Sequence, residues 1–168
     1  GNATLTAAVE TIWNQSEAAA REAINSIPDG LYEAESFLDD DGINLETRLP
    51  IKVAVEVTGD NMTIDFSKIS DQVTGPLNSG ISGGGYTVAR VAFKFLVAPH
   101  EPANEGTFRP LNLTLPPGKI LSATNNAAMG RYNMPLPTVI DTVIRAMAPA
   151  MPNFAAAAHF GNFCTLRF

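Results

Sequence analysis

Basic residues and cysteine are scarce in this sequence. Its 168 residues include 11 lysines and arginines against 17 aspartates and glutamates, which gives a formal net charge of −6. Proteins that bind nucleic acid or an anionic membrane need a basic face, so we expect neither partner. The single cysteine, Cys164, cannot form an internal disulfide, which agrees with a reducing compartment.

Long apolar runs are also missing from the sequence. No stretch approaches the ~18 apolar residues of a membrane span, and the amino terminus lacks the pattern of a signal peptide. We therefore expect a cytoplasmic protein. A content of 45% hydrophobic and 17% charged residues is typical of a globular domain somewhat poor in charge, so we expect residues 1–168 to form a single domain. The apolar end at 160–168 is unusual for a chain terminus and favours a piece of a longer protein.

Residues 51–67 alternate between apolar and polar side chains on both sides of Gly59-Asp60-Asn61. This period of two is typical of strands that bury one face. The central Gly, Asp and Asn supply the positive φ angles that a tight hairpin needs. The segment therefore predicts an antiparallel β-hairpin, and residues 31–38 and 109–115 read as further strands.

Three segments, about 6–26, 86–97 and 138–148, show the apolar spacing of amphipathic helices. Together with the hairpin they predict an α+β fold, in which an antiparallel β-sheet packs against three helices. Thr138 is the expected N-cap of the last helix. The expected buried stripes are Val9, Ile12, Trp13, Ala20, Ile24 and Ile27 in the first helix, Val88, Val91, Ala92, Phe95 and Leu96 in the second, and Val139, Ile140, Val143 and Met147 in the third.

Three consecutive carboxylates, Asp39, Asp40 and Asp41, precede Gly42. Such a group could hold a divalent cation, but the spaced ligand pattern of a calcium loop is absent. Asp and Gly are turn formers that leave their charges in solvent. The pattern therefore favours a turn over a metal site.

Three glycines, Gly83 to Gly85, stand before the second expected helix. Their N–H groups could bind an anion at the helix amino terminus. Neither the P-loop pattern nor G-x-G-x-x-G is present, so the glycines could equally serve close packing.

The other candidate groups are isolated in the sequence. His100, His159 and Cys164 are too far apart to predict a zinc site, and the sequence assigns no catalytic residue. Arg109 and Arg131 could each clamp a carboxylate or a phosphate. For Arg109 an internal ion pair with Glu105 is the favoured reading.

Five segments together resemble the B-type subunit of the hydantoinase/5-oxoprolinase family, which also includes acetone and acetophenone carboxylase subunits. The resemblance holds in sequence and in order, and it covers nearly the whole chain. Lys68-Ile69 departs from it, since family members often have Gly-Thr there. The segments are 28–42, 59–67, 71–80, 99–121 and 135–148.

The resemblance implies that the chain is the later portion of a B-type subunit, which in this family is part of an ATP-dependent cyclic-amide hydrolase or a ketone carboxylase. The chain would supply scaffold, a subunit interface and substrate-channel loops, and would be inactive alone. ATP would act in an A-type partner subunit, and a divalent metal would bind upstream of the matched region, so we expect no cofactor in this chain.

The expected substrate-binding residues are Asp65, Ser67, Asn78, Gly84, Asn104, Glu105 and Arg109. The alternative is a non-enzymatic α+β binding module that holds an anionic ligand in its glycine-rich loop.

Overall fold

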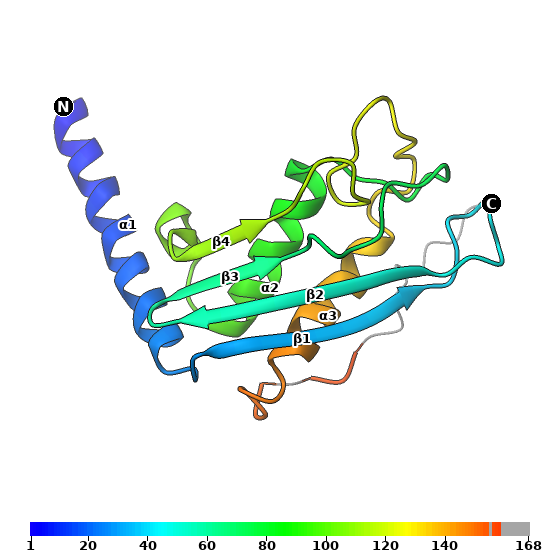
Figure 1. Ribbon diagram of the computed structural model, residues 1–168. Coiled ribbons are helices and arrows are strands. Elements are labelled where there is room, and N and C mark those ends of the chain that lie inside the picture. Colours follow the sequence, from blue (N-terminus) through cyan, green and yellow to red (C-terminus); the bar gives the residue numbers. More distant parts are fainter. Residues whose placement is uncertain (155, 159–168) are drawn as a thin grey trace.

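The computed structural model describes residues 1–154 and 156–158. Two helices cover one face of a four-stranded sheet, and a third helix leaves one end of the sheet (Figure 1). The predicted α+β class is confirmed. Along the chain, the elements are α1 (Asn2–Asn25), β1 (Gly30–Leu38), β2 (Leu49–Thr58), β3 (Asn61–Asp65), the π-helical turn η1 (Ser82–Tyr86), α2 (Thr87–Val97), the 3₁₀ turn η2 (Glu105–Phe108), β4 (Leu111–Thr114) and α3 (Pro135–Met147).

The predicted hairpin is confirmed as β2 and β3. The strands pair antiparallel from Ala54 with Asp65 to Thr58 with Asn61, and Gly59 in the turn has a φ of 58°. Every second side chain of the two strands faces the helices and is buried, as the alternation requires. These core residues are Ile51, Val53, Val55, Val57, Met62 and Ile64, followed by Phe66 just after β3.

The sheet order is β1-β2-β3-β4, and its last pair corrects the expectation of an all-antiparallel sheet. β4 runs parallel to β3, with Met62 opposite Leu111 and Asp65 opposite Thr114. Two parallel neighbours need a crossover connection, usually through a helix, and α2 lies on this connection. The alternation of residues 109–115 is the same in both directions, so it could not show the direction of the strand.

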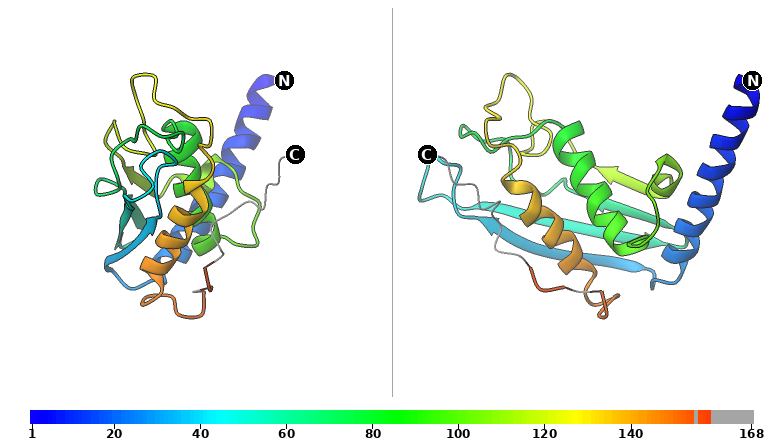
Figure 2. Two further views of the ribbon diagram at one scale, coloured as in Figure 1. Left: turned by 90° about the vertical axis from the view of Figure 1, so that its right-hand side faces the viewer. Right: turned by 180° about the vertical axis from the view of Figure 1, so that it is seen from behind.

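All three helices exist, with shifted ends or faces. α1 begins at Asn2, four residues before the expected start, and its first half projects away from the sheet (Figures 1 and 2). α3 begins at Pro135, so Thr138 lies inside the helix and is not its N-cap. In α2, Val91 and Phe95 are exposed, whereas Ala89 and Phe93 are buried. Because α2 is apolar on nearly every side, its spacing could not select the buried face.

Two long loops, residues 66–81 and 115–134, lie side by side beyond the sheet. Ser79 N–H donates to Ile120 O at 2.8 Å, and Ala123 N–H donates back to Ser79 O at 3.0 Å. Ile120 and Leu121 are completely buried. The loops therefore form an ordered, packed cap on the sheet.

Candidate functional site

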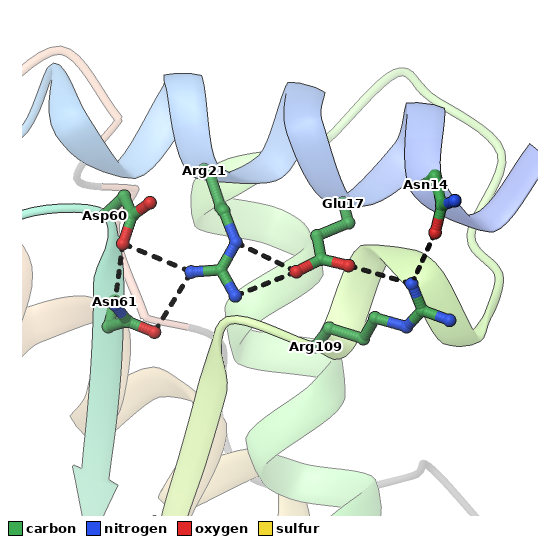
Figure 3. A network of polar contacts seen from close by, with 6 residues as sticks. All are labelled: Asn14, Glu17, Arg21, Asp60, Asn61 and Arg109. Atoms are coloured by element: carbon green, nitrogen blue, oxygen red, sulfur yellow. Dashed lines mark hydrogen bonds and ion pairs between the residues drawn. The ribbon is translucent and has the colours of Figure 1, made fainter.

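A network of six polar side chains joins α1 to the rest of the fold (Figure 3). We call it the α1 junction. At its centre the Glu17 carboxylate lies between two guanidinium groups, with Arg21 Nη2 and Arg109 Nη1 each at 2.8 Å. Hydrogen bonds from Arg109 and Arg21 hold the pKa of Glu17 below its ordinary value. The junction consists of Asn14, Glu17, Arg21, Asp60, Asn61 and Arg109.

Arg21 also contacts the β2–β3 turn, and Arg109 makes a second contact with α1. Arg21 Nη1 contacts Asp60 Oδ1 at 3.1 Å, which ties α1 to the β2–β3 turn. Arg109 Nη1 donates to Asn14 Oδ1 at 2.8 Å. The junction therefore fixes the second half of α1 against two separate elements of the fold.

Beside the α1 junction, Asn104 shapes the turn η2 and connects it to α1. Its Oδ1 accepts from Gly106 N–H at 2.9 Å, and its Nδ2 donates to Ser16 Oγ at 2.7 Å. Gly106 packs directly on α1, because a Cβ at this position would lie 2.0 Å from Trp13 O. The predicted residue Asn104 is thus a cap in the structure.

The predicted pair of Arg109 with Glu105 is wrong, since each residue has a different partner. Glu105 forms a bidentate pair with Arg90, at 3.0 and 2.8 Å. The hydrogen bond from Arg90 lowers the pKa of Glu105. Arg109 instead pairs with Glu17, because η2 brings it alongside α1, a contact that residues 105–109 alone could not reveal.

The uncovered face of the sheet carries a hollow of about 400 Å³, which we call the sheet hollow. The predicted residues Asp65 and Ser67 line it, and Asp65 Oδ1 accepts from Ser67 N–H at 2.6 Å. Two ion pairs border it, Lys52 with Glu35 at 3.3 Å and Lys68 with Glu33 at 3.5 Å. The hollow is lined by Glu33, Ala34, Glu35, Lys52, Val53, Ala54, Asp65, Ser67 and Lys68.

The sequence reasoning missed the lysines and glutamates of the sheet hollow. The alternation of the sequence contains part of this information, because Glu33 and Glu35 occupy exposed positions of β1 and Lys52 occupies an exposed position of β2. Only the register of the two strands, in which Glu35 stands opposite Lys52, shows that they meet.

Asn78 lies inside the first packed loop, and Gly84 lies in η1, directly after that loop. The Asn78 side chain is completely buried. It accepts from Val73 N–H at 2.7 Å and donates to the carbonyl oxygens of Val73, Gly75 and Ala128 at 2.8 to 3.0 Å. At Gly84, a Cβ would lie 2.1 Å from Ser79 Oγ. In this structure Asn78 holds the loops through hydrogen bonds, and Gly84 allows a close contact with Ser79.

The glycine-rich loop does not offer all of its N–H groups to an anion. Gly84 N–H donates to Gly80 O at 2.8 Å, and Gly85 N–H donates to Leu121 O at 3.1 Å. These two glycines are buried. The geometry therefore favours the packing interpretation of this loop over the anion-binding one.

The three aspartates form a turn, as predicted, but one of them is not in solvent. Asp41 is only 2% exposed. Its carboxylate accepts hydrogen bonds from the backbone N–H groups of Asn44, Ile43 and Gly75 at 2.6 to 3.2 Å. These bonds, that of Asn44 first, hold the pKa of Asp41 below its ordinary value. Asp41 thus joins the β1–β2 connection to the loop at Gly75.

The remaining candidates are scattered over the structure. His100 is exposed, whereas His159 and Cys164 lie outside the described residues. Arg131 lines a hollow next to Asp39 and Asp40. Within residues 1–154 and 156–158, no group of three or more His, Cys, Asp or Glu side chains could hold a metal ion. In the same residues, no helix combines the length and the hydropathy needed to cross a membrane.

Comparison with known protein families gives a match over residues 1–168 to the family model described as hydantoinase B/oxoprolinase. The chain belongs to this family. A protein named as the B-type component of a D-/L-hydantoinase, from Pseudomonas sp. strain NS671, is 33% identical over 98% of the chain. The acetophenone carboxylase delta subunit of Aromatoleum aromaticum is 28% identical over 80% of the chain.

A solved structure shares the fold of this chain. The crystal structure of the ATP-dependent caprolactamase from Pseudomonas jessenii superposes on 91% of the chain, with a TM-score of 0.79 and 22% identity. The chain spans only part of each relative: 29% of the hydantoinase subunit, 20% of the carboxylase subunit and 26% of the caprolactamase chain.

The family segments recognised in the sequence build connected parts of this structure. Residues 28–42 form β1 and the aspartate turn, and residues 59–67 contain β3 and the edge of the sheet hollow. Residues 71–80 form the middle of the first packed loop, and residues 99–121 contain η2, β4 and the start of the second packed loop. The resemblance therefore follows the framework of the fold.

Proposed function

We propose that this chain is part of the B-type subunit of an ATP-dependent cyclic-amide hydrolase, or of a related ketone carboxylase. In this proposal residues 1–168 form one domain of the subunit, which supplies scaffold and interface surface and is inactive alone. The observation that carries it is the family match over residues 1–168 in a chain that spans 29% of its hydantoinase relative.

The electrostatics of the described residues support a scaffold role. Strongly shifted pKa values often mark catalytic acids and bases. Here the carboxyl groups with a lowered pKa are Glu17, Asp41 and Glu105. Glu17 and Glu105 owe the shift first to an arginine of another element. Asp41 owes it first to the backbone N–H groups of Asn44 and Ile43 in its own connection. Hydrogen bonds that stabilise the fold therefore account for these pKa shifts.

The names of the relatives support a partner subunit and a use of ATP in this proposal. Two relatives are named as subunits, and the caprolactamase is named as ATP-dependent. We assign ATP to an A-type partner subunit in the cytoplasm. Phosphorylation of an amide oxygen would turn it into a good leaving group. The described residues do not fit a divalent metal, so we assign the metal to another part of the B-type subunit and derive no step through it here.

Within the chain, we assign contact with a small-molecule substrate to the sheet hollow. Asp65 and Ser67 are half-exposed there, and the hollow of about 400 Å³ is large enough for a small cyclic amide. The loops at 71–86 and 100–109 would border the substrate channel. The other candidate residues, Asn78, Gly84, Asn104, Glu105 and Arg109, would position these loops.

The test is reconstitution of the full-length B-type subunit with its A-type partner, ATP and a divalent metal. We expect ATP hydrolysis that depends on a cyclic amide or a ketone. Asp65→Asn should lower kcat/KM, whereas Thr63→Ala, on the same face of β3 but outside the hollow, should not. Absence of turnover with every cyclic amide and ketone would refute the enzyme proposal, and an unaffected Asp65→Asn variant would refute the assignment of the hollow.

A further inference from the structure

The first half of α1 exposes large apolar side chains. Leu5 is 66% exposed and Ile12 is 53% exposed, and Val9 between them is half-buried. At 3.6 residues per turn, these three positions fall on one side of the helix, within about 60° of arc. We call them the α1 stripe. This half of the helix stands clear of the sheet in all three views (Figures 1 and 2).

A helix with this sequence needs a packing partner. In proteins most helix stability comes from the packing of an apolar face rather than from intrinsic propensity, and β-branched residues lower that propensity further. Residues 2–13 contain five β-branched residues and a single charge, Glu10. The N-cap, Gly1, provides no side-chain hydrogen bond. The ion pairs of α1 involve Glu17 and Arg21, beyond this part of the helix.

The α1 stripe leads into a groove of about 310 Å³ between α1 and the segment that follows α2. Ile12 belongs to both. Apolar side chains such as Ala19, Val97 and Pro102 line the groove, and Glu101 is the one charged residue among its described lining residues. An apolar stripe beside a groove is the geometry in which one amphipathic helix binds another.

We propose that the α1 stripe and this groove bind an amphipathic helix from the part of the B-type subunit outside residues 1–168. The proposal rests on the proposed function, because it takes this chain as a portion of a larger subunit. The relatives leave ample length for such a helix, since the chain spans 29% and 26% of two of them. Glu101 calls for a lysine or arginine at the edge of the bound helix.

The occupant is assigned to the same polypeptide because the first half of α1 exposes its apolar side chains and has no ion pair of its own with the described part of the chain. A covalently connected segment is present at a high effective concentration, so it covers the stripe at every protein concentration. A separate subunit would leave the stripe bare whenever the complex dissociates, and a bare apolar helix favours aggregation.

The test uses a photo-reactive benzophenone amino acid at position 12 of the full-length B-type subunit, without its A-type partner. We expect crosslinks at the mass of a single chain, mapped by mass spectrometry to a helix outside residues 1–168. The matched control is position 7, which is exposed and lies on the opposite side of α1, where this crosslink should be absent. A crosslinked dimer, a crosslink that forms only with the A-type subunit, or no crosslink at position 12 would overturn the proposal.

A second measurement keeps this inference separate from the proposed function. Ile12→Asp should lower the melting temperature of the full-length subunit, and Ala7→Asp should not. Equal melting temperatures for the two variants would contradict the inference. If the crosslink fails while the unmodified subunit supports ATP-dependent turnover, only the docking inference is lost; if the crosslink forms without turnover in any reconstitution, only the enzyme proposal is lost.

Discussion

Replacing Asn78 by alanine is expected to destabilise the protein far more than replacing an exposed amide. The side chain is completely buried; its oxygen accepts one hydrogen bond, and its two amide hydrogens are shared among three carbonyl oxygens. A buried hydrogen bond contributes a net ~1 kcal/mol, so the loss of three such bonds is about 3 kcal/mol. This is a large part of the ~5–15 kcal/mol by which most domains are stable.

The assay is denaturant unfolding, with the free energy of unfolding compared at an unchanged m-value. Asn112→Ala is the matched control, because Asn112 is an exposed amide on β4, and exposed substitutions usually change stability by less than ~0.5 kcal/mol. A change of that small size for Asn78→Ala would show that the hydrogen bonds of Asn78 do not hold the loops together.

Asn78→Asp tests the same reasoning with a side chain of equal shape. One carboxylate oxygen could still accept from Val73 N–H, but the other would face the carbonyl oxygens that the amide group now contacts. Burial and these oxygens would raise the pKa of the new carboxyl group. The variant should therefore be least stable at neutral pH and regain stability relative to the wild type as the pH falls through that raised pKa. A constant difference between pH 4 and 8 would refute this argument.

Three further predictions follow from packing and charge. Gly106→Ala should displace α1, because the new Cβ would lie 2.0 Å from a backbone oxygen of that helix. The rate of hydrogen exchange in α1 should therefore rise, whereas Gly83→Ala, with open space around it, should leave that rate unchanged. Equal exchange rates in the two variants would contradict this prediction. Asp41→Asn should make the melting temperature fall less steeply in acid. The stability due to the lowered pKa of Asp41 is present above the ordinary value of about 3.9 and is lost as the pH falls through the folded value. If the melting temperatures of variant and wild type changed in parallel from pH 7 to 3, this reasoning would be wrong. Ile64→Ala should cost about 2–5 kcal/mol in denaturant unfolding because the side chain is fully buried, and a loss as small as that of Thr63→Ala would rule out the assigned core face.

The sequence correctly predicted the elements whose local pattern fits only one kind of structure. Residues 51–67 combine a period of two with a Gly-Asp turn, and they form the hairpin of β2 and β3. α2 was correctly predicted to be a helix, but the prediction that Val91 and Phe95 are buried was wrong, because the helix carries apolar side chains on most of its sides. The parallel direction of β4 depends on the path of the chain through α2, which no local pattern encodes.

The predicted site residues fared differently because their partners are distant in the sequence. Asp65 and Ser67 lie in a hollow, as a surface site requires. Arg109 was paired with its neighbour Glu105, although its partner Glu17 is 92 residues away. Asp41 was placed in solvent because Asp-Gly turns usually are, but Gly75 from another loop covers it. Such contacts follow from the fold and not from spacing.

The position of α3 has a consequence for folding during synthesis on the ribosome. α3 packs on β1 and β2, but β2 ends at Thr58 and α3 begins at Pro135. The ribosome therefore completes the apolar face of the first two strands long before the helix that shields it has been translated. During that interval the nascent chain presents a bare aliphatic surface, the kind of surface that chaperones protect from aggregation.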